Sequence, residues 1–197
     1  MKHTGICLFA LAGLASLVVG AAPTAGERVS LFNGDNLNGW TVLKCEAKAD
    51  GGDIFIEGGN GLVQTEKKYS DFVLEFDWKA LSDDNWDSGV YFRYDSVPPD
   101  RPWPPKYQAN LRKGLEGNVA ELEGASSKGL VKAHEWNTFK LTVKGDKVDL
   151  QINGSQAWKA GGLSGPRNGY MALQAEVPNG GQHRFRNIYI TELKTAE

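Results

Sequence analysis

Apolar and polar residues alternate along several short stretches of the chain, with the period of two that is typical of half-buried β-strands. In residues 72–79, FVLEFDWK, the positions of one strand face are Phe, Leu, Phe and Trp, and those of the other are Val, Glu, Asp and Lys. The alternation returns in 136–143, 147–152, 170–176 and 185–193. No stretch of useful length has the apolar spacing of a helix, so the pattern predicts an all-β chain.

Turn signals separate these strands. Lys144-Gly145-Asp146 and Asn153-Gly154 follow two of the alternating stretches and predict hairpins. Short strands at 53–57 and 61–65 flank a Gly-rich segment, and we expect them to form a further hairpin. Residues 26–197 are therefore predicted to form a single domain, a two-sheet antiparallel β-sandwich, and about 170 residues are enough for one sizeable core.

Residues 71–79 and 89–94 are joined by a short loop, and we expect the two strands to be neighbours. Their shared polar face would then carry Glu75, Asp77, Lys79, Tyr91 and Arg93. A polar face that also holds aromatic rings is typical of a surface that binds sugars, because such rings have an apolar face beside a polar edge.

The first 25 residues have the three parts of a secretory signal peptide. Lys2 is followed by an apolar run from Ile6 to Val19 and then by the small residues 20–22. The run is short for a membrane span, so we expect a secreted or periplasmic protein whose mature chain is not inserted in a membrane. The formal charge is −2 and like charges do not cluster, which argues against nucleic acid as a partner.

Prolines fill the segment 97–105, VPPDRPWPP, which must be a loop because proline has no N–H to give to a sheet. Trp103 in this loop either walls a binding groove or covers apolar surface. The acidic loop with Asp83, Asp84 and Asp87 either holds a divalent cation, since hard cations need clustered oxygens, or is a solvated turn.

Glu121 and Glu123 share one side of an expected short strand at 119–123. Two carboxylates at this spacing are either an acid and base pair or a solvated edge. His134 and His183 are far apart and lack the spacing of zinc ligands, and no metal-ligand residues are assigned. The motifs of serine hydrolases, zincins, phosphate loops and dinucleotide folds are absent from the sequence, so these classes lack support.

Five blocks of sequence resemble a known family. They are LFNGDNLNGW at 31–40, DFVLEFDWK at 71–79, DSGVYFR at 87–93, GYMALQAE at 169–176 and FRNIYI at 185–190. In this order they are similar to the 3-keto-disaccharide hydrolase domains, secreted bacterial domains of the concanavalin A-like lectin/glucanase superfamily. The resemblance implies a jelly roll and an activity on glycosides that carry a ketone at C3.

Such a ketone makes the proton at C2 acidic, so a base can remove it and the glycosidic oxygen can leave by elimination, after which water adds. This chemistry needs a base, an electrophile for the enolate oxygen and an acid for the leaving group. On the resemblance, Glu176 is the candidate base, Arg93 or a divalent ion the electrophile, and Asp77 or Tyr91 the acid. The side chains expected to bind the sugar are Lys79, Tyr91, Gln108, Gln174, Trp86 and Trp103.

Some positions depart from the family pattern. Lys106 and Leu111 stand where the family often has Glu and Asp around Gln108, and Glu176 stands where many members have His. One alternative is a lectin-like carbohydrate-binding module without chemistry. Another is a hydrolase of the laminarinase type, for which Glu75 and Asp77 are too few because Lys79 takes the third acidic position.

Overall fold

The computed structural model describes residues 25–193, and the predicted signal peptide lies outside them apart from its last residue. The strands are β1 Ala25–Ser30, β2 Trp40–Asp50, β3 Asp53–Thr65, β4 Phe72–Ala80, β5 Gly89–Tyr94, β6 Gln108–Asn110, β7 Asn137–Lys144, β8 Lys147–Ile152, β9 Ser155–Ala160, β10 Tyr170–Glu176 and β11 His183–Leu193. This part of the chain contains no helix, so none could cross a membrane. The all-β prediction is confirmed.

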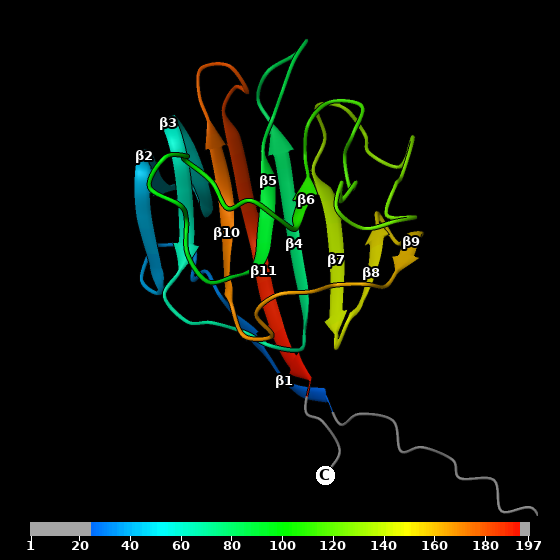
Figure 1. The fold of residues 1–197 in the computed structure, drawn as a ribbon. Helices are drawn as coiled ribbons and strands as arrows, with labels where there is room; N and C mark the ends of the chain where they lie inside the picture. Colours follow the sequence, from blue (N-terminus) through cyan, green and yellow to red (C-terminus); the bar gives the residue numbers. More distant parts are fainter. Residues whose placement is uncertain (1–24, 194–197) are drawn as a thin grey trace, which may run out of the picture.

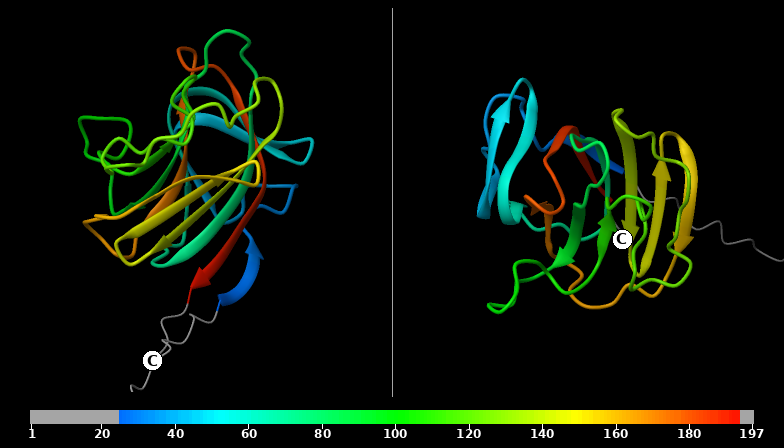
Figure 2. Two further views of the ribbon diagram at one scale, coloured as in Figure 1. Left: turned by 90° about the vertical axis from the view of Figure 1, so that its right-hand side faces the viewer. Right: turned by 90° about the horizontal axis from the view of Figure 1, so that it is seen from above.

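All strand pairings are antiparallel and form one hydrogen-bonded sheet. Its order is β6-β5-β10-β3-β11-β4-β7-β8-β9, with β1 added to β11 and β2 to β3. The sheet curls until its two halves face each other (Figures 1 and 2). A single large cluster of buried side chains lies between the halves, with Phe92 and Leu173 from one half and Phe76, Phe139 and Leu150 from the other.

The strand β3 carries the curl, because it changes partner along its length. Residues 54–56 pair with β11, and residues 60–64 pair with β10. Between them Gly59 has a φ of +84°, which bends the strand where side-chain-bearing residues would be strained. The predicted hairpin of 53–57 with 61–65 is therefore wrong: the glycines mark a bend within one strand, and β2 pairs along both parts of it.

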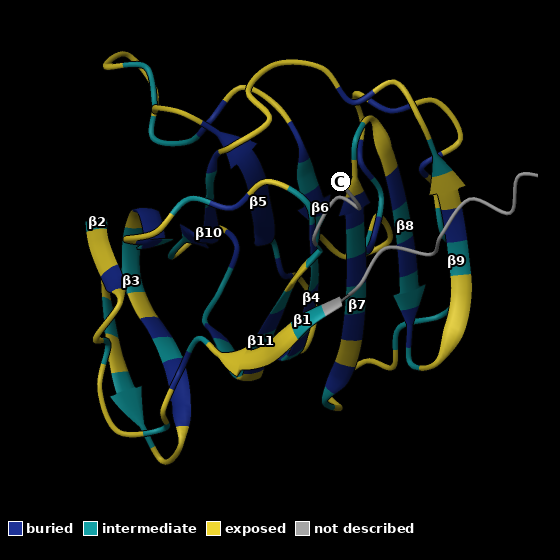
Figure 3. Cartoon of the chain, turned by 90° about the horizontal axis from the view of Figure 1, so that it is seen from below, coloured by how far each residue is buried: buried dark blue, intermediate teal, exposed yellow. Residues whose placement is uncertain are grey.

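Burial follows the predicted alternation in β4 but not in β5. Phe72, Leu74, Phe76 and Trp78 of β4 point into the core, whereas β5 is buried along its whole length (Figure 3). One side of β5 faces the core. The loop between β5 and β6 covers the other side, as it runs across the front of β10 and β3 (Figure 1).

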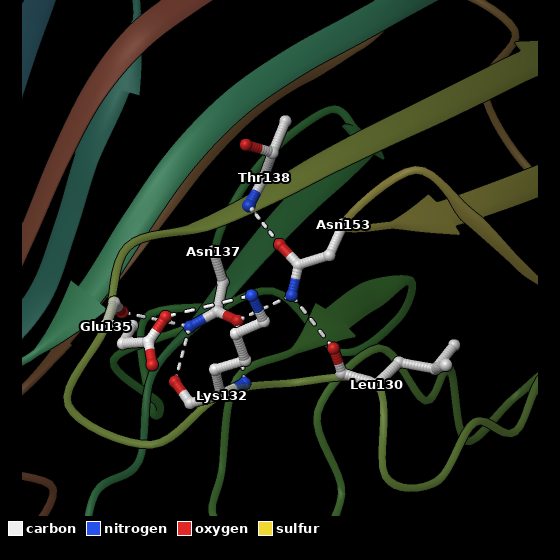
Figure 4. Close-up of polar contacts among 6 residues, drawn as sticks. All are labelled: Leu130, Lys132, Glu135, Asn137, Thr138 and Asn153. Carbon is white, nitrogen blue, oxygen red and sulfur yellow. Dashed lines mark hydrogen bonds and ion pairs between the residues drawn. The ribbon is translucent and has the colours of Figure 1, made fainter.

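Residues 111–136 connect β6 to β7 without a strand, and the strand predicted at 119–123 is a series of turns. Two asparagines fasten the end of this loop to the β7–β8 hairpin (Figure 4). The buried Asn137 amide binds the backbone of the loop, and the Asn153 side chain bridges to it. The bonded residues are Leu130, Lys132, Glu135, Asn137, Thr138 and Asn153.

The buried His183 is expected to make the stability of the fold depend on pH. The ring is 1% exposed between aromatic neighbours, and burial lowers its pKa from 6.5 to about 4. The unfolded chain therefore binds a proton between these values that the folded chain does not, so stability falls as pH falls through this range. At about 1.4 kcal/mol for each pKa unit, the loss is about 3 kcal/mol.

Urea unfolding between pH 7 and pH 4 measures this loss. His183→Phe keeps an aromatic ring beside Trp78 and removes the titrating group, so its stability is expected to fall less steeply over the same range. Equal slopes for the two proteins would show that other groups cause the acid loss.

Candidate functional site

Three adjacent strands bring four of the predicted residues onto one face of the sheet. The register pairs Ala172 of β10 with Tyr91 of β5, and Tyr91 with Gln108 of β6. Gln174 and Glu176 follow Ala172 at the spacing of two that keeps side chains on one face. This face lies outside the core, because the intervening β10 residues belong to the core cluster.

A chain of hydrogen bonds orients the Glu176 carboxylate. Gln108 donates its Nε2–H to the Oε1 of Gln174, and Gln174 donates its Nε2–H to the Oε2 of Glu176 at 3.0 Å. Gln174 is 3% exposed, so its amide has little freedom to turn away. Burial and the charge of Asp87 raise the pKa of Glu176, which brings it nearer to the neutral range in which acid–base groups work best.

Gly89 leaves room for this chain. A Cβ atom at position 89 would stand 2.0 Å from the Nε2 of Gln108 and 2.3 Å from its Cδ. We expect Gly89→Ala to displace Gln108 and to weaken sugar binding about fivefold, since a lost hydrogen bond is worth roughly 1 kcal/mol. Titration of the intrinsic tryptophan fluorescence measures the affinity.

Gly161→Ala is the matched control for Gly89→Ala, because a Cβ at position 161 meets no atom within 4 Å. Its affinity should equal that of the unchanged protein. Unchanged affinity in Gly89→Ala as well would mean that Gln108 does not set the shape of the site.

Two charged residues of the site were not among the predicted site residues. Arg112 lies in the loop after β6, and its Nε is 3.6 Å from the Oδ2 of Asp87. Burial raises the pKa of Asp87, and the positive charge of Arg112 opposes that rise. Asp87 lies in the loop before β5, but the spacing of two that relates Tyr91 to Gly89 reaches Asp87 when it is continued by one step. Nothing in the sequence indicated Arg112.

The proline-rich loop walls the site on one side. Trp103 packs against the buried cluster of Leu62, Tyr91, Tyr94 and Ala172, and its indole N–H donates to the Ala175 carbonyl at 3.2 Å. Trp103 therefore covers apolar surface, and it does so at the border of the site. A pocket of about 130 Å³ opens beside it, lined by Tyr91, Arg101, Pro104, Pro105, Lys106, Gln108, Asn110, Ala120 and Glu121.

Tyr91 lines this pocket and is 7% exposed. Burial raises the pKa of its hydroxyl, and the nearby carboxylates add to the effect. The hydroxyl therefore keeps its proton at neutral pH and can donate a hydrogen bond to a bound molecule.

Asp77 and Lys79 do not lie at this site. The prediction that 71–79 and 89–94 are neighbouring strands is wrong, because β11 and β3 stand between β4 and β10. Asp77 accepts hydrogen bonds from Thr138 at 2.6 Å and Asn187 at 2.7 Å, on the outer face of the other half of the sheet. Alternation shows which residues share a strand face, but not in which half of the sheet the strand lies.

Arg93 is buried in a structural ion pair and does not face Glu176. It is 3% exposed, and its nitrogens donate to the Asp71 carboxylate at 2.6 Å and to the carbonyls of Ser70 and Gly145 at 2.7 and 3.0 Å. Its φ of 53° interrupts the strand, so the alternation that would place it beside Tyr91 is broken. The role of enolate electrophile does not fit this placement.

Trp86 is also placed differently from the prediction. Its ring belongs to the core cluster at 3% exposure, and the Nζ of Lys113 lies 5.0 Å from the ring centroid. A sugar would have no exposed ring face on which to stack.

The acidic loop does not fit a divalent cation. Asp87 faces Arg112, and Asp83 lies 3.4 Å from His134. Within residues 25–193 no group of three or more His, Cys, Asp or Glu side chains converges as metal ligands.

Comparison with known proteins identifies the family of this chain. The family model described as a 3-keto-alpha-glucoside-1,2-lyase-like domain matches residues 27–191, so the chain belongs to this family. This confirms the family that the sequence blocks indicated. No curated protein matches the chain.

Solved structures share the fold at low identity. A protein from Parabacteroides distasonis, proposed to be a glycosyl hydrolase, is 20% identical with a TM-score of 0.67, over 85% of this chain and 94% of that one. The carbohydrate-binding module CBM66 from Bacillus subtilis is 20% identical with a TM-score of 0.51, over 76% and 93%. A β-glucanase from Bacillus licheniformis is 10% identical with a TM-score of 0.50, over 86% and 98%.

Proposed function

We propose that this domain binds carbohydrate and cleaves glycosides that carry a ketone at C3, by elimination followed by addition of water. Its family membership supports the substrate class. The observation that carries the chemistry is the Glu176 carboxylate, which the buried amide of Gln174 holds on the same face of the sheet as Tyr91. A carboxyl group with a raised pKa in such a place suits proton transfer to and from carbon or oxygen.

The pocket lined by Tyr91, Arg101 and Gln108 offers groups for the enolate oxygen. The Tyr91 hydroxyl keeps its proton and can donate it, and Arg101 brings a positive charge to the same pocket. These groups take the place that Arg93 was expected to hold. Negative charge that develops on the C3 oxygen would be stabilised by such donors in a partly water-excluded site.

The finer assignments made from the sequence belong to the same proposal. We infer that the curled sheet works as the two layers of a concanavalin A-like jelly roll, with the site on the outer face of one layer. Residues 26–197 are proposed to be one domain, and the leader pattern at 1–25 supports export to the periplasm or the medium.

The experiment compares a 3-keto-disaccharide with its unoxidised parent and follows the release of monosaccharide, with and without a chelator. We expect release from the ketone alone, since only a ketone makes the C2 proton acidic. Cleavage of both sugars would instead indicate an ordinary glycoside hydrolase. Loss of activity with the chelator would add a metal ion to the reaction.

A carbohydrate-binding module is the second candidate. β6, Gln108–Asn110, contributes amides but no carboxylate to the face of the site, and Leu111 is fully buried. A face so rich in amides would suit recognition without chemistry. Tryptophan fluorescence that reports sugar binding without cleavage of either disaccharide would favour this candidate.

A further inference from the structure

Asp87 lies in the loop two residues before β5, and Glu176 is the last residue of β10, the strand that pairs with β5. The register pairs Ala172 with Tyr91 and Leu173 with Val90. The same register, carried to the end of β10, sets Glu176 opposite Asp87. Directly opposed residues of antiparallel strands have Cβ atoms about 4.5–5.5 Å apart and point to the same face.

The loop between β10 and β11 ties the two backbones together at this point. The amide of Asp87 donates to the Gly180 carbonyl at 2.8 Å, and the amide of Gly180 donates to the Glu176 carbonyl at 2.5 Å. One residue thus bridges the two acidic positions. The loops of residues 81–88 and 177–182 reach the same end of the molecule, beyond the ends of β5 and β10 (Figure 1).

The charged neighbours of the two carboxyl groups differ. Burial raises the pKa of both carboxyl groups, and Arg112 lowers both. The two groups differ in geometry, because the Asp87 carboxylate lies 3.6 Å from the Nε of Arg112, and its charge further raises the pKa of Glu176. The hydroxyl of Tyr91 on the same face is neutral. Arg101 and Glu121 line the same pocket as Tyr91, and Arg101 lowers the pKa of Tyr91 whereas Glu121 raises it. The ion pair with Arg112 therefore favours Asp87 as the ionised member of the pair.

We propose that Asp87 is a second catalytic residue, the base that removes the C2 proton, and that Glu176 is the acid that protonates the leaving oxygen. The proposal rests on the proposed function. Glu176, which the sequence suggested as the base, becomes the acid. Asp87 takes the place of Asp77 as the second carboxyl group, because Asp77 lies on the other half of the sheet.

The proton transfers balance over the cycle. The Asp87 carboxylate forms an O–H bond to the C2 proton, and the electron pair of the C2–H bond passes to the enolate oxygen at C3. The enolate re-forms the ketone, a double bond forms between C1 and C2, and the C1–O bond breaks as Glu176 protonates the leaving oxygen. Water then adds to C1 and gives its proton to Glu176, while Asp87 returns its proton to C2.

Two variants and two substrates test these roles. The substrates are a 3-keto-disaccharide and a p-nitrophenyl 3-keto-glucoside, whose leaving group departs without protonation. Asp87→Asn is expected to lose about 100-fold or more with both substrates, since every substrate needs the base. Glu176→Gln should lose a similar factor with the disaccharide but less than about tenfold with the p-nitrophenyl compound.

Asp83→Asn is the control, because it changes an aspartate of the same loop whose side chain is 89% exposed. Its rates should match those of the unchanged protein. The opposite pattern, in which Asp87→Asn is rescued by the p-nitrophenyl group and Glu176→Gln is not, would overturn the assignment of roles. Asp87→Asn at full rate would overturn any catalytic role for Asp87, whereas an unchanged protein inactive on both ketones would overturn the proposed function itself.

A third variant reads the charge relation directly and serves if Asp87→Asn does not fold. Arg112→Gln removes the cation that lowers the pKa of both carboxyl groups and that pairs with Asp87, so the acid limb of the pH–rate profile should move to higher pH, and the alkaline limb should move in the same direction. A limb that stays in place would contradict the assignment of the base to Asp87.

Discussion

Glu176→Gln is expected to lower the rate of 3-keto-disaccharide cleavage by about 10²–10⁴-fold, the usual contribution of a group that transfers a proton in the transition state. The amide of glutamine has nearly the shape of the carboxyl group and can still accept the hydrogen bond that Gln174 donates at 3.0 Å. Sugar binding should therefore change little. The rate is measured as monosaccharide release at saturating substrate, and the affinity by tryptophan fluorescence.

Glu123→Gln is the matched control for this loss, since Glu123 is exposed in the loop 111–136 and has no part in the hydrogen-bond chain. It should keep full activity. A loss of less than about tenfold in Glu176→Gln would remove Glu176 from proton transfer, because such groups contribute more than this. The face around Glu176 would then be a binding surface, as the second candidate function requires.

Local pattern was enough to find half of this site. The alternation of 170–176 predicts β10 with its observed bounds, and it places Gln174 and Glu176 on one face. The same spacing, continued from Tyr91 and Gly89 of β5 one step into the preceding loop, reaches Asp87. These are properties of one strand, and the period of two contains them.

Pairing between distant strands is what local pattern could not supply. β5 lies beside β10 rather than β4, although only the loop of residues 81–88 separates it from β4. That loop crosses to the other half of the curled sheet, and Asp77 is left on a different surface. The curl itself depends on the glycines of β3, whose sequence is equally compatible with a tight turn.

Backbone irregularity caused the error at Arg93. A strand that kept its alternation would present this arginine beside Tyr91, where a cation would suit an enolate. The left-handed conformation of Arg93 turns the side chain away instead, and its nitrogens donate hydrogen bonds to three partners that are distant in the sequence. A single residue with positive φ has no reliable signature when it is not glycine, asparagine or aspartate.

Arg93→Ala is therefore expected to destabilise the fold by about 3–5 kcal/mol, the cost of removing one partner from a buried ion pair. The change leaves the partly buried Asp71, whose side chain is 15% exposed, without its main cation, and it leaves the Ser70 and Gly145 carbonyls without the Arg93 donor. Urea unfolding measures the loss. The rate for each folded molecule, measured where the variant is still folded, should be close to that of the unchanged protein.

Lys48→Met removes an exposed ion pair and is the control for Arg93→Ala. Lys48 and Glu57 lie 3.1 Å apart, with side chains 51% and 43% exposed, and such pairs contribute at most about 1 kcal/mol. Comparing the stability losses of the two variants separates the contribution of the Arg93–Asp71 ion pair from that of an exposed ion pair. A large fall in rate with little loss of stability in Arg93→Ala would contradict the structural role, and would return Arg93 to the catalytic surface that its place in the sequence suggested.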